Sequence, residues 1–317
     1  MTRVCIVGGS GFIGRHAAEL LGRRQDQVVV PTRNRERAKR DLIMLPTVDL
    51  VAANIHVDAE LDRLFTGCHT VINLIGVLNS KAGKPYGPMF ELIHVELPRR
   101  ITEACRRRGV RRLVHVSAIG AAENAPSEYL RSKAAGEREV LAAAADIGVT
   151  VFRPSVVFGP QDRFLNLFAK LQRFAPVVFL AMPDAKFQPV FVEDVAGALV
   201  ACIDEDHSNG QVYELAGPRV YTLRELVGYA GVLAGCPRPI IGLGTVLSLA
   251  QAWVLEHLPG KLMTRDNVRS MRVPSVSSAS LPFGIQPTPL EAVAPGYLGR
   301  DRLLSRYERF RHIAARR

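Results

Sequence analysis

The chain opens on a short apolar run that leads directly into three closely spaced glycines, Gly8, Gly11 and Gly14. The run is typical of a buried parallel strand, and an amphipathic helical pattern follows it over residues 12–23. In such a turn the first glycine lets the chain reverse, the second lets backbone N–H groups approach a diphosphate, and the third lets the helix pack on the strand. Because a helix N-terminus favours negative charge, the turn predicts a dinucleotide site, against the alternative of a purely structural turn.

Strand-like apolar runs and helical patterns alternate through the first half of the chain. We expect strands near residues 4–7, 28–31, 48–53, 70–75, 112–117 and 149–153. We expect helices near residues 12–23, 35–44, 58–65, 89–107 and 127–146. This alternation predicts right-handed crossovers and a doubly wound parallel sheet of the α/β class, with helices on both faces.

The pattern changes after about residue 154, where prolines and glycines become frequent and the strands shorten. The elements expected here are strands at 190–192 and 212–215 and helices at 193–204 and 222–234. We therefore predict a nucleotide-binding domain over residues 1–154 and a smaller substrate or lid region over residues 155–298 that interleaves with the sheet. Within that region, residues 271–297 are rich in Pro, Ser and Gly and predict an extended surface segment.

The cysteines, the histidines, the N-terminus and the apolar runs argue against a disulfide-linked, metal-binding, secreted or membrane-spanning protein. The five cysteines are scattered and form no C-x-x-C pair, which predicts reduced, buried thiols in a cytoplasmic-type compartment. The eight histidines show no metal-ligand spacing, so we expect no metal site. The N-terminus has no basic n-region, so no secretory signal is expected. No apolar run reaches the length of about 20 residues that a membrane span needs, and Ile240 to Leu258 is expected to form a buried or interfacial helix.

The net charge of +11 calls for an anionic partner or surface. One basic cluster comprises Arg106, Arg107, Arg108, Arg111 and Arg112, and a second lies in the tail over residues 299–317. The tail predicts an amphipathic helix with Leu303, Leu304, Tyr307 and Phe310 on one face. No nucleic-acid-binding motif accompanies the charge, so no nucleic acid is expected. The alternatives are a solvated basic face with a tail packed on the domain, or contact with an anionic membrane surface or a protein partner.

The end of the second expected strand indicates which dinucleotide binds. A site for NAD usually has Asp or Glu there to bind the ribose 2′-hydroxyl. This chain has no acid at that point and instead carries Arg33 and Arg35 directly after Thr32. Because a guanidinium binds a phosphate in a bidentate manner, these residues predict NADP(H) rather than NAD. The alternative is a solvated helix N-terminus.

Residues with proton-transfer chemistry follow the fifth expected strand. Ser117 lies at its carboxyl end, and Tyr129 and Lys133 are four residues apart on the next helix and share one face. A neighbouring ammonium stabilises a phenolate, so Tyr129 is expected to have a lowered pKa and to exchange a proton with a carbonyl or alcohol. Tyr-x-x-x-Lys alone is common on helices, and it becomes specific in a chain that opens with the glycine turn.

Together these motifs resemble the extended and atypical short-chain dehydrogenase/reductases, from residue 3 to about residue 230. The resemblance rests on the glycine turn, Asn73-Leu74-Ile75-Gly76, Tyr129-x-x-x-Lys133, Arg153-Pro154-Ser155-Val156-Val157-Phe158-Gly159-Pro160 and Phe191-Val192-Glu193-Asp194-Val195-Ala196. A narrower likeness lies in residues 128–134 and 158–166, above all in Asp162-Arg163-Phe164-Leu165-Asn166. These segments resemble the nucleotide-binding accessory subunit of respiratory complex I and its bacterial relatives.

The resemblance implies a Rossmann domain that holds NADPH, with catalytic roles for Tyr129, Lys133 and Ser117. It also implies a set of cofactor-binding residues: Gly8, Ser10, Gly11, Phe12, Ile13, Gly14, Thr32, Arg33, Arg35, Asn54, Ile55, Leu74, Ile75, Gly76, Val116, Tyr129, Lys133, Pro154, Val156 and Val157. In active members the Tyr is the acid or base, the Lys binds ribose, and a Ser or Thr polarises the substrate carbonyl. Here that hydroxyl position falls on Ala118, and the usual helix asparagine is replaced by His94.

Two functions fit these observations. One is an NADP(H)-binding protein that uses the nucleotide as a structural or regulatory element and joins a respiratory or quinone-biosynthesis complex, in the cytoplasm or peripherally on the inner membrane. The other is an active NADPH-dependent reductase or epimerase in which Tyr129 is the acid or base. For the second, Phe164, Leu165, Phe168, Phe187 and Gln188 suggest a pocket for a small apolar substrate or a quinone, or else plain core.

Overall fold

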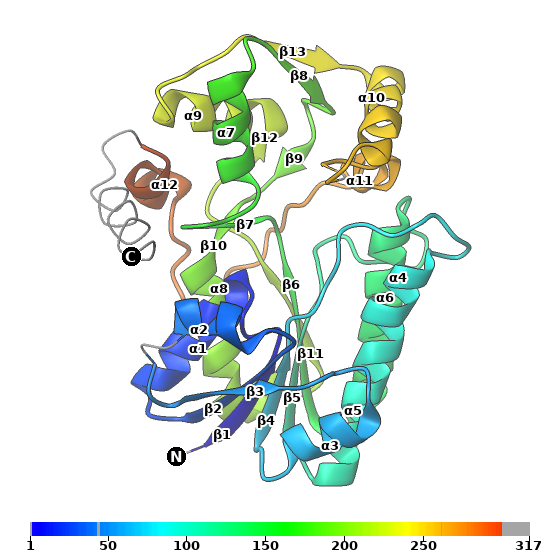
Figure 1. Ribbon diagram of the computed structural model, residues 1–317, viewed down its shortest axis with the longest axis vertical. Coiled ribbons are helices and arrows are strands. Elements are labelled where there is room, and N and C mark those ends of the chain that lie inside the picture. Colours follow the sequence, from blue (N-terminus) through cyan, green and yellow to red (C-terminus); the bar gives the residue numbers. More distant parts are fainter. Residues whose placement is uncertain (1, 43–44, 261, 300–317) are drawn as a thin grey trace.

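The computed structural model of the protein describes residues 2–42, 45–260 and 262–299. It consists of a lower part built on a central sheet and an upper lobe of short strands and helices (Figure 1). Residues 300–317, which include the apolar face predicted for the tail, lie outside the described residues.

A seven-stranded sheet forms the centre of the lower part. Its order is β11-β6-β5-β4-β1-β2-β3, and every pair of neighbours is parallel. The strands are β1 (Arg3–Val7), β2 (Gln27–Thr32), β3 (Val48–Ala52), β4 (Thr70–Asn73), β5 (Arg112–Val116), β6 (Gly148–Pro154) and β11 (Gln211–Leu215). The predicted doubly wound α/β fold is confirmed. The strand order reverses between β1 and β4, so a crevice for ligands is expected at the carboxyl ends of these two strands.

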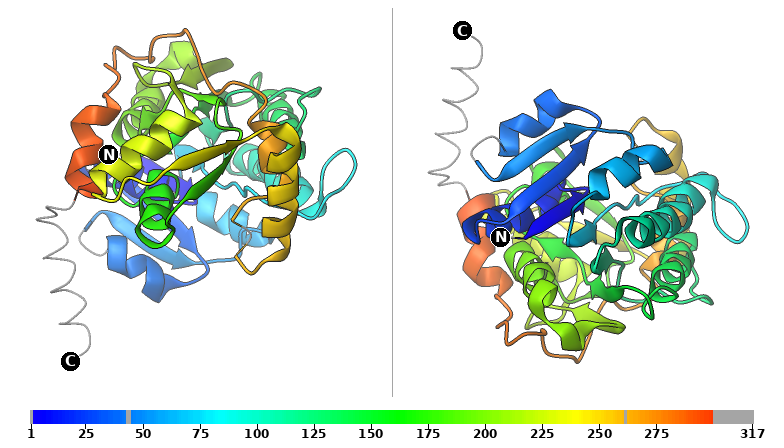
Figure 2. Two further views of the ribbon diagram at one scale, coloured as in Figure 1. Left: turned by 90° about the horizontal axis from the view of Figure 1, so that it is seen from above. Right: turned by 90° about the horizontal axis from the view of Figure 1, so that it is seen from below.

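Helices cover both faces of the sheet (Figures 1 and 2). One face carries α1 (Phe12–Arg23), α2 (Arg35–Leu42) and α8 (Val192–Ala201), and the other carries α3 (Asp58–Phe65), α5 (Leu97–Arg108) and α6 (Glu128–Leu141). Val4 and Ile6 pack into the first core, and Cys5 and Val7 into the second. Because both faces are buried, β1 is apolar at each of these successive positions.

The upper lobe consists of three short strand pairs and five helices among the described residues. The pairs are β7 (Val157–Phe158) with β10 (Val190–Phe191), β8 (Val178–Ala181) with β13 (Ile240–Leu243), and β9 (Lys186–Phe187) with β12 (Tyr221–Thr222). The helices are α7 (Leu165–Phe174), α9 (Leu223–Leu233), α10 (Thr245–His257), α11 (Arg265–Ser270) and α12 (Leu290–Leu298). Helix α8 and strand β11 lie after residue 154 in sequence but pack with the lower part, so the two halves of the chain interleave.

Two expectations for this half of the chain are wrong. Ile240 to Leu258 forms strand β13 followed by helix α10, with Gly244 at the helix N-cap, rather than one helix. Residues 271–297 are not extended throughout, because α12 occupies their end and buries Leu290 and Ala294. The backbone N–H and the hydroxyl of Thr288 donate to the Asp194 carboxylate at 2.7 and 2.9 Å, which holds this segment against α8.

The five cysteines are free thiols, and all except Cys236 are buried, as predicted. Burial raises the pKa of the Cys105 and Cys202 thiols, to about 12 for Cys202. Among the described residues, every helix is too short or too polar to cross a bilayer.

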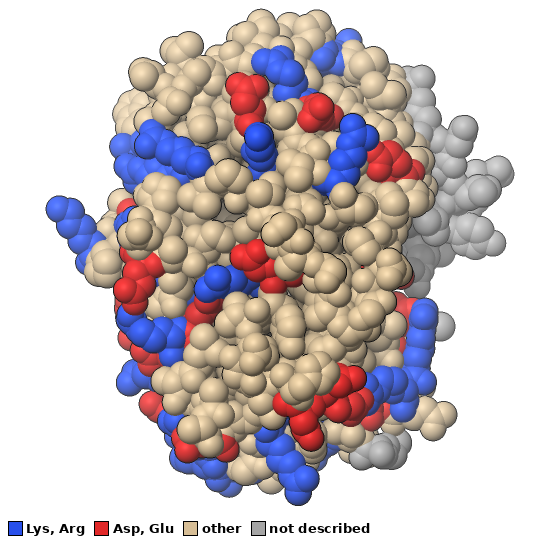
Figure 3. Space-filling view, turned by 180° about the vertical axis from the view of Figure 1, so that it is seen from behind, with Lys and Arg blue, Asp and Glu red and all other residues tan. Residues whose placement is uncertain are grey.

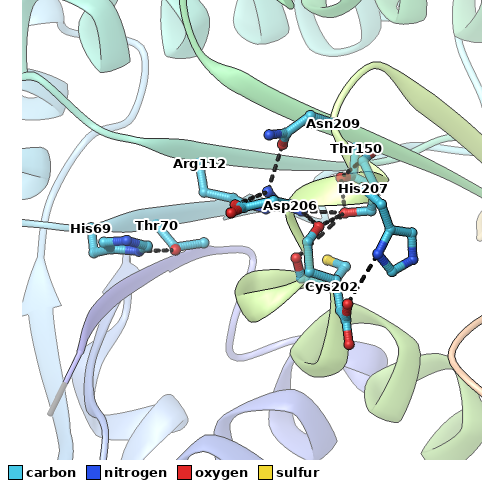
Figure 4. A network of polar contacts seen from close by, with 10 residues as sticks. His69, Thr70, Arg112, Thr150, Cys202, Asp206, His207 and Asn209 are labelled. Atoms are coloured by element: carbon cyan, nitrogen blue, oxygen red, sulfur yellow. Dashed lines mark hydrogen bonds and ion pairs between the residues drawn. The ribbon is translucent and has the colours of Figure 1, made fainter.

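A buried arginine organises the amino-terminal edge of the sheet (Figure 4). Arg112, at the start of β5, donates to Asn209 Oδ1 at 2.5 Å, to the Glu205 carbonyl oxygen at 2.6 Å and to Ser208 Oγ. These contacts tie two 3₁₀ turns, η2 (Cys202–Asp204) and η3 (Asp206–Ser208), to the sheet. Arg112 is therefore a structural residue and not part of an exposed basic surface.

The rest of that basic cluster is also largely paired. Arg106 forms an ion pair with Asp146 at 2.7 Å, and Arg107 forms one with Asp62 at 2.9 Å. Arg108 lies 3.5 Å from the same Asp62 carboxylate. The cluster therefore offers less free positive charge than its sequence suggests.

Candidate functional site

The glycine turn joins β1 to α1 through very close backbone packing. Gly8 has a φ of +92°, which favours glycine. A Cβ on Gly14 would lie 2.5 Å from the Gly9 Cα and 2.6 Å from the Gly8 carbonyl oxygen. Gly11 is the N-cap of α1 and has no side chain to cap the helix. The helix therefore begins at an exposed residue, next to the exposed Ser10 and the partly buried Phe12 and Ile13.

The ends of β2 and β3 lie beside this turn and carry the predicted phosphate-binding arginines. Arg33 and Arg35 are exposed, and Thr32 Oγ1 accepts a hydrogen bond from the Asn34 N–H at 3.2 Å. After β3, Asn54 Oδ1 accepts from the His56 N–H at 3.1 Å and shapes the loop that contains Ile55. No carboxylate occupies positions 32–35.

The end of β4 connects the glycine turn to the helix that carries Tyr129. Asn73 is buried; its Oδ1 accepts from the Ile75 N–H at 3.2 Å, and its Nδ2 lies 3.1 Å from His115 Nδ1. A Cβ on Gly8 would lie 3.1 Å from Ile75 Cδ1, and a Cβ on Gly76 would lie 3.4 Å from Lys133 Nζ. The segment over residues 74–76 therefore lies between the glycine turn and Lys133.

Lys133 and Tyr129 share one face of α6, as predicted. Lys133 is buried, and its Nζ donates to the Val116 carbonyl oxygen at 3.1 Å. Burial lowers the pKa of Lys133 to about 8 and raises the pKa of Tyr129 to about 12. The expected lowering of the Tyr129 pKa is therefore wrong for the protein alone, because burial of the phenol raises its pKa.

His94, which the sequence resemblance places where an asparagine is usual, bridges two segments of the chain. It lies in a π-helical segment, η1 (Glu91–Glu96), which follows the short helix α4 (Pro88–Phe90). Its Nε2 accepts from the Val77 N–H at 3.0 Å, so Nδ1 carries the proton and donates to Ser132 Oγ at 2.8 Å. Its ring stands edge-on to that of Tyr129, with centroids 5.5 Å apart. Burial, with Lys133 nearby, lowers the pKa of His94 to about 2, so the ring is neutral.

The N-terminus of α6 is held by a residue that the sequence did not reveal. Both carboxylate oxygens of Asp266, on α11, accept backbone N–H groups from α6, from Glu128 at 2.8 Å and from Tyr129 at 3.0 Å. Ser127 caps the same turn through the Leu130 N–H. Because Asp266 lies 137 residues from Tyr129 in sequence, no local pattern could have indicated it.

The remaining predicted site residues lie at the carboxyl ends of β5 and β6. Ser117 is only 4% exposed, and its Oγ has no hydrogen-bond partner among the described residues. Pro154 ends β6, and Val156 and Val157 follow it. Val157 packs in the same apolar cluster as Phe12 and Ile13. The fold thus brings this segment to the glycine turn, whereas the Ser117 hydroxyl lies inside the protein.

The distinctive Asp162-to-Asn166 run has a structural role. Asp162 is buried and accepts N–H groups from Gly159, Phe164, Leu165 and Asn166, which fixes the start of α7. Tyr297 on α12 donates its hydroxyl to Asp162 at 2.8 Å.

The aromatic residues proposed as a pocket pack against one another. The rings of Phe164 and Phe168 lie 5.3 Å apart, those of Phe164 and Phe187 lie 5.7 Å apart, and Leu165 is fully buried. Gln188 is held by the Gly217 carbonyl oxygen and the Ser277 N–H. These contacts favour the core interpretation.

Comparison with known proteins agrees with this architecture. Residues 4–216 match the NAD dependent epimerase/dehydratase family. The chain belongs to that family. The matched residues include the glycine turn, Tyr129 and Lys133 but end before α9, so the family match leaves out most of the upper lobe.

Two relatives are similar over longer parts of this family member. The mouse (Mus musculus) protein named NADH dehydrogenase (ubiquinone) 1 alpha subcomplex subunit 9, mitochondrial, is 32% identical over 94% of this chain and 80% of its own length. The ceramide reductase of Caulobacter vibrioides is 31% identical over 79% of this chain and 78% of its own. The narrower likeness predicted from the sequence is therefore confirmed.

Solved structures of the epimerase/dehydratase type share the fold. The UDP-glucose 4-epimerase of Thermus thermophilus, solved in complex with NAD, is 22% identical and has a TM-score of 0.64. The alignment covers 86% of this chain and 99% of that one. This similarity supports the Rossmann-type architecture of the chain.

Proposed function

We propose that this protein binds NADP(H) mainly as a structural or regulatory cofactor and associates with a membrane-bound respiratory or quinone system of the complex I type. The observation that carries the proposal is the similarity to a protein named as an NADH dehydrogenase (ubiquinone) subunit, which extends over 94% of the chain. The 94% share means that the similarity also reaches into the part of the upper lobe that follows residue 216, where the family match ends.

The residues present fit a dinucleotide. The backbone packs closely at the glycine turn: a Cβ would lie 3.0 Å from the Gly8 carbonyl oxygen at Gly11 and 2.5 Å from the Gly9 Cα at Gly14. The N-terminus of the twelve-residue α1 follows this turn directly. The diphosphate would bind there, the adenine near Asn54 and Ile55, and the nicotinamide ribose near Tyr129 and Lys133. Leu74, Ile75, Gly76 and the segment over residues 154–157 would line the remaining path. When bound, a reduced nicotinamide supplies a hydride.

Arg33 supports NADP(H) over NAD(H). Its guanidinium is exposed at the end of β2, where it can bind a 2′-phosphate without first breaking a buried contact. We expect Arg33→Ala to weaken NADPH binding by about 10- to 100-fold, as for loss of a charge-assisted bidentate contact, and to leave NADH binding unchanged. Titration of both nucleotides by calorimetry measures the difference. Arg37→Ala, on the first turn of α2, is the matched control; equal losses for both nucleotides at Arg33 would contradict the assignment.

The surroundings of Tyr129 favour binding over turnover. The position that would supply a carbonyl-polarising hydroxyl is Ala118, and Ser117 beside it is buried. His94 is neutral, and both of its ring nitrogens are engaged in hydrogen bonds, one with the Val77 N–H and one with Ser132 Oγ. It therefore has no free nitrogen through which to transfer a proton to Tyr129. Lys133 keeps a position from which it would bind ribose hydroxyls.

Turnover measurements decide between the two functions. We expect Lys133→Met to lower NADPH affinity about tenfold, because a charge-assisted contact to ribose is lost, and Tyr129→Phe to leave affinity unchanged. We also expect no NADPH oxidation with quinone or carbonyl panels, measured as loss of nicotinamide absorbance, in the purified wild-type protein. A wild-type turnover that Tyr129→Phe abolishes would overturn the structural-cofactor role.

The second candidate is an NADPH-dependent reductase acting on an apolar carbonyl compound. It is favoured by the retained Tyr129–Lys133 pair and by the similarity to a protein named ceramide reductase. In that reaction the Tyr129 phenol would donate its proton to the carbonyl oxygen, and a pKa near 12 keeps it protonated at neutral pH.

A further inference from the structure

The upper lobe carries a surface of exposed apolar side chains, which we call the α10 surface. It comprises Phe179, Ile241, Val246, Leu247, Trp253, Val254 and Leu258. Val246 is 79% exposed, Leu247 60% and Trp253 53%. Phe179 and Ile241 are paired across β8 and β13, and the Gln251 side chain of α10 donates to the Phe179 carbonyl oxygen at 2.8 Å. The strand pair and the helix therefore form one continuous surface.

This surface differs from the usual exterior of a soluble protein. The 17 residues from 239 to 255 contain no Lys, Arg, Asp or Glu. A surface helix normally turns charged residues outward, whereas α10 buries Ser248 and Ala252 and exposes its large apolar residues. Contiguous apolar patches of this kind mark contact sites for partners or membranes.

The charge of the surrounding lobe indicates which partner. Residues 159–191 and 217–299 together contain 11 Lys and Arg but only 6 Asp and Glu. Three of those acids, Asp162, Glu225 and Asp266, cap helices, and a fourth, Glu256, pairs with Arg265 at 2.7 Å. On the back of the molecule, basic side chains are spread over the upper lobe, with acidic side chains among them (Figure 3). The lobe that carries the apolar surface is therefore net positively charged.

We propose that the α10 surface docks on an anionic lipid bilayer, with α10 lying in the plane of the interface. A bilayer with acidic lipids offers both an apolar layer and a negative surface, and tryptophan favours the headgroup level at which Trp253 would lie. A second copy of the chain fits less well, because a symmetric contact would bring together two lobes of the same net positive charge. The inference rests on the membrane association in the proposed function and assigns the surface that makes it.

The same element is tied to the helix that carries Tyr129. Arg265, at the start of α11, pairs with Glu256 of α10, and the next residue, Asp266, caps α6. Asn267 Nδ2 donates to the Leu78 carbonyl oxygen at 3.2 Å, on the loop after β4. Figure 1 shows α10 and α11 directly above this end of α6. Docking through α10 would therefore place the N-terminal end of α6 close to the bilayer.

The test uses the single tryptophan of the chain, Trp253, as its probe. Full-length protein is mixed with vesicles of phosphatidylcholine, with and without phosphatidylglycerol, and with vesicles that contain brominated lipids. We expect flotation with the acidic vesicles only, a blue shift of the emission, and quenching by bromine. If the protein binds the vesicles but the Trp253 emission is neither shifted nor quenched, the α10 surface is not the docking surface. Membrane association would then occur through another surface. No binding to either vesicle would overturn both.

A pair of variants checks the same point independently. Val246→Asp should reduce vesicle binding about tenfold or more, because it removes an inserted side chain and adds a charge that acidic lipids repel. Val232→Asp is the matched control. Val232 is 62% exposed on α9, outside the α10 surface, and its replacement by Asp changes the charge by the same amount. Bound NADPH should be equal in both variants, which separates this result from the cofactor proposal. Equal vesicle binding by the two variants would contradict the inference.

Discussion

Gly14→Ala is expected to abolish nucleotide binding and to destabilise the protein, although it adds a single methyl group. The new Cβ would lie 2.5 Å from the Gly9 Cα and 2.6 Å from the Gly8 carbonyl oxygen. These are backbone atoms that no side-chain rotation can move away. Helix α1 must shift away from β1, which costs about 1–3 kcal/mol of overpacking and displaces the helix N-terminus from the diphosphate position.

The matched control for this change lies on the same helix. At Gly22 the nearest atom to a new Cβ would be the Thr47 Oγ1 at 3.1 Å, the end of a side chain. Gly22→Ala should keep the nucleotide and change stability by at most about 1 kcal/mol, since alanine favours a helix more than glycine does. Nucleotide released on denaturation and urea unfolding measure both effects. Nucleotide retained at the wild-type level in Gly14→Ala would show that the turn is structural only.

The protein is also expected to lose stability steeply below about pH 6.5, through two buried imidazoles. Burial, with Lys133 nearby, lowers the pKa of His94 to about 2 and that of His115 to about 3, from 6.5. In the unfolded chain both rings bind protons as the pH falls below 6.5, whereas in the folded protein they do not. The free energy of unfolding therefore decreases with falling pH, by up to about 1.4 kcal/mol per pH unit for each ring, until the pH approaches the folded values.

His94→Gln separates the contribution of one ring. The glutamine amide can still accept from the Val77 N–H and donate to Ser132 Oγ, so the two contacts of His94 have replacements. Urea denaturation between about pH 6 and pH 4.5 measures how the free energy of unfolding changes with pH. We expect this slope to be smaller in the variant by about 1.4 kcal/mol per pH unit, which corresponds to about one proton fewer taken up on unfolding. Above about pH 7.5 the two slopes should coincide, because the ring is neutral in both states. An unchanged acid slope would mean that His94 is protonated in the folded protein.

The sequence predicted the sheet and the close turn between its first strand and first helix well, because both depend on local patterns. Apolar runs identify buried parallel strands, and Gly14 identifies close packing between a helix and a strand. The spacing of Tyr129 and Lys133 correctly predicts a shared helix face. In each case the residues involved lie within one turn or one strand of each other.

The rest could not be predicted because it depends on contacts between distant segments. The break between β13 and α10 depends on one glycine, Gly244, within an otherwise uniform apolar run. Helix α12 lies in a Pro-, Ser- and Gly-rich stretch, and Tyr297 and Thr288 anchor that stretch to acids far away in the sequence. The raised Tyr129 pKa reflects burial by α6 and its neighbours, which Tyr-x-x-x-Lys does not encode.

The cap that Asp266 provides for α6 limits how this chain can be shortened. A fragment ending at residue 216, where the family match stops, would contain every residue of the proposed cofactor site. It would nevertheless leave the Glu128 and Tyr129 N–H groups without the carboxylate that accepts them in the whole protein. Expression designs and domain grafts that use the dinucleotide-binding part alone therefore need a new acceptor at that helix end.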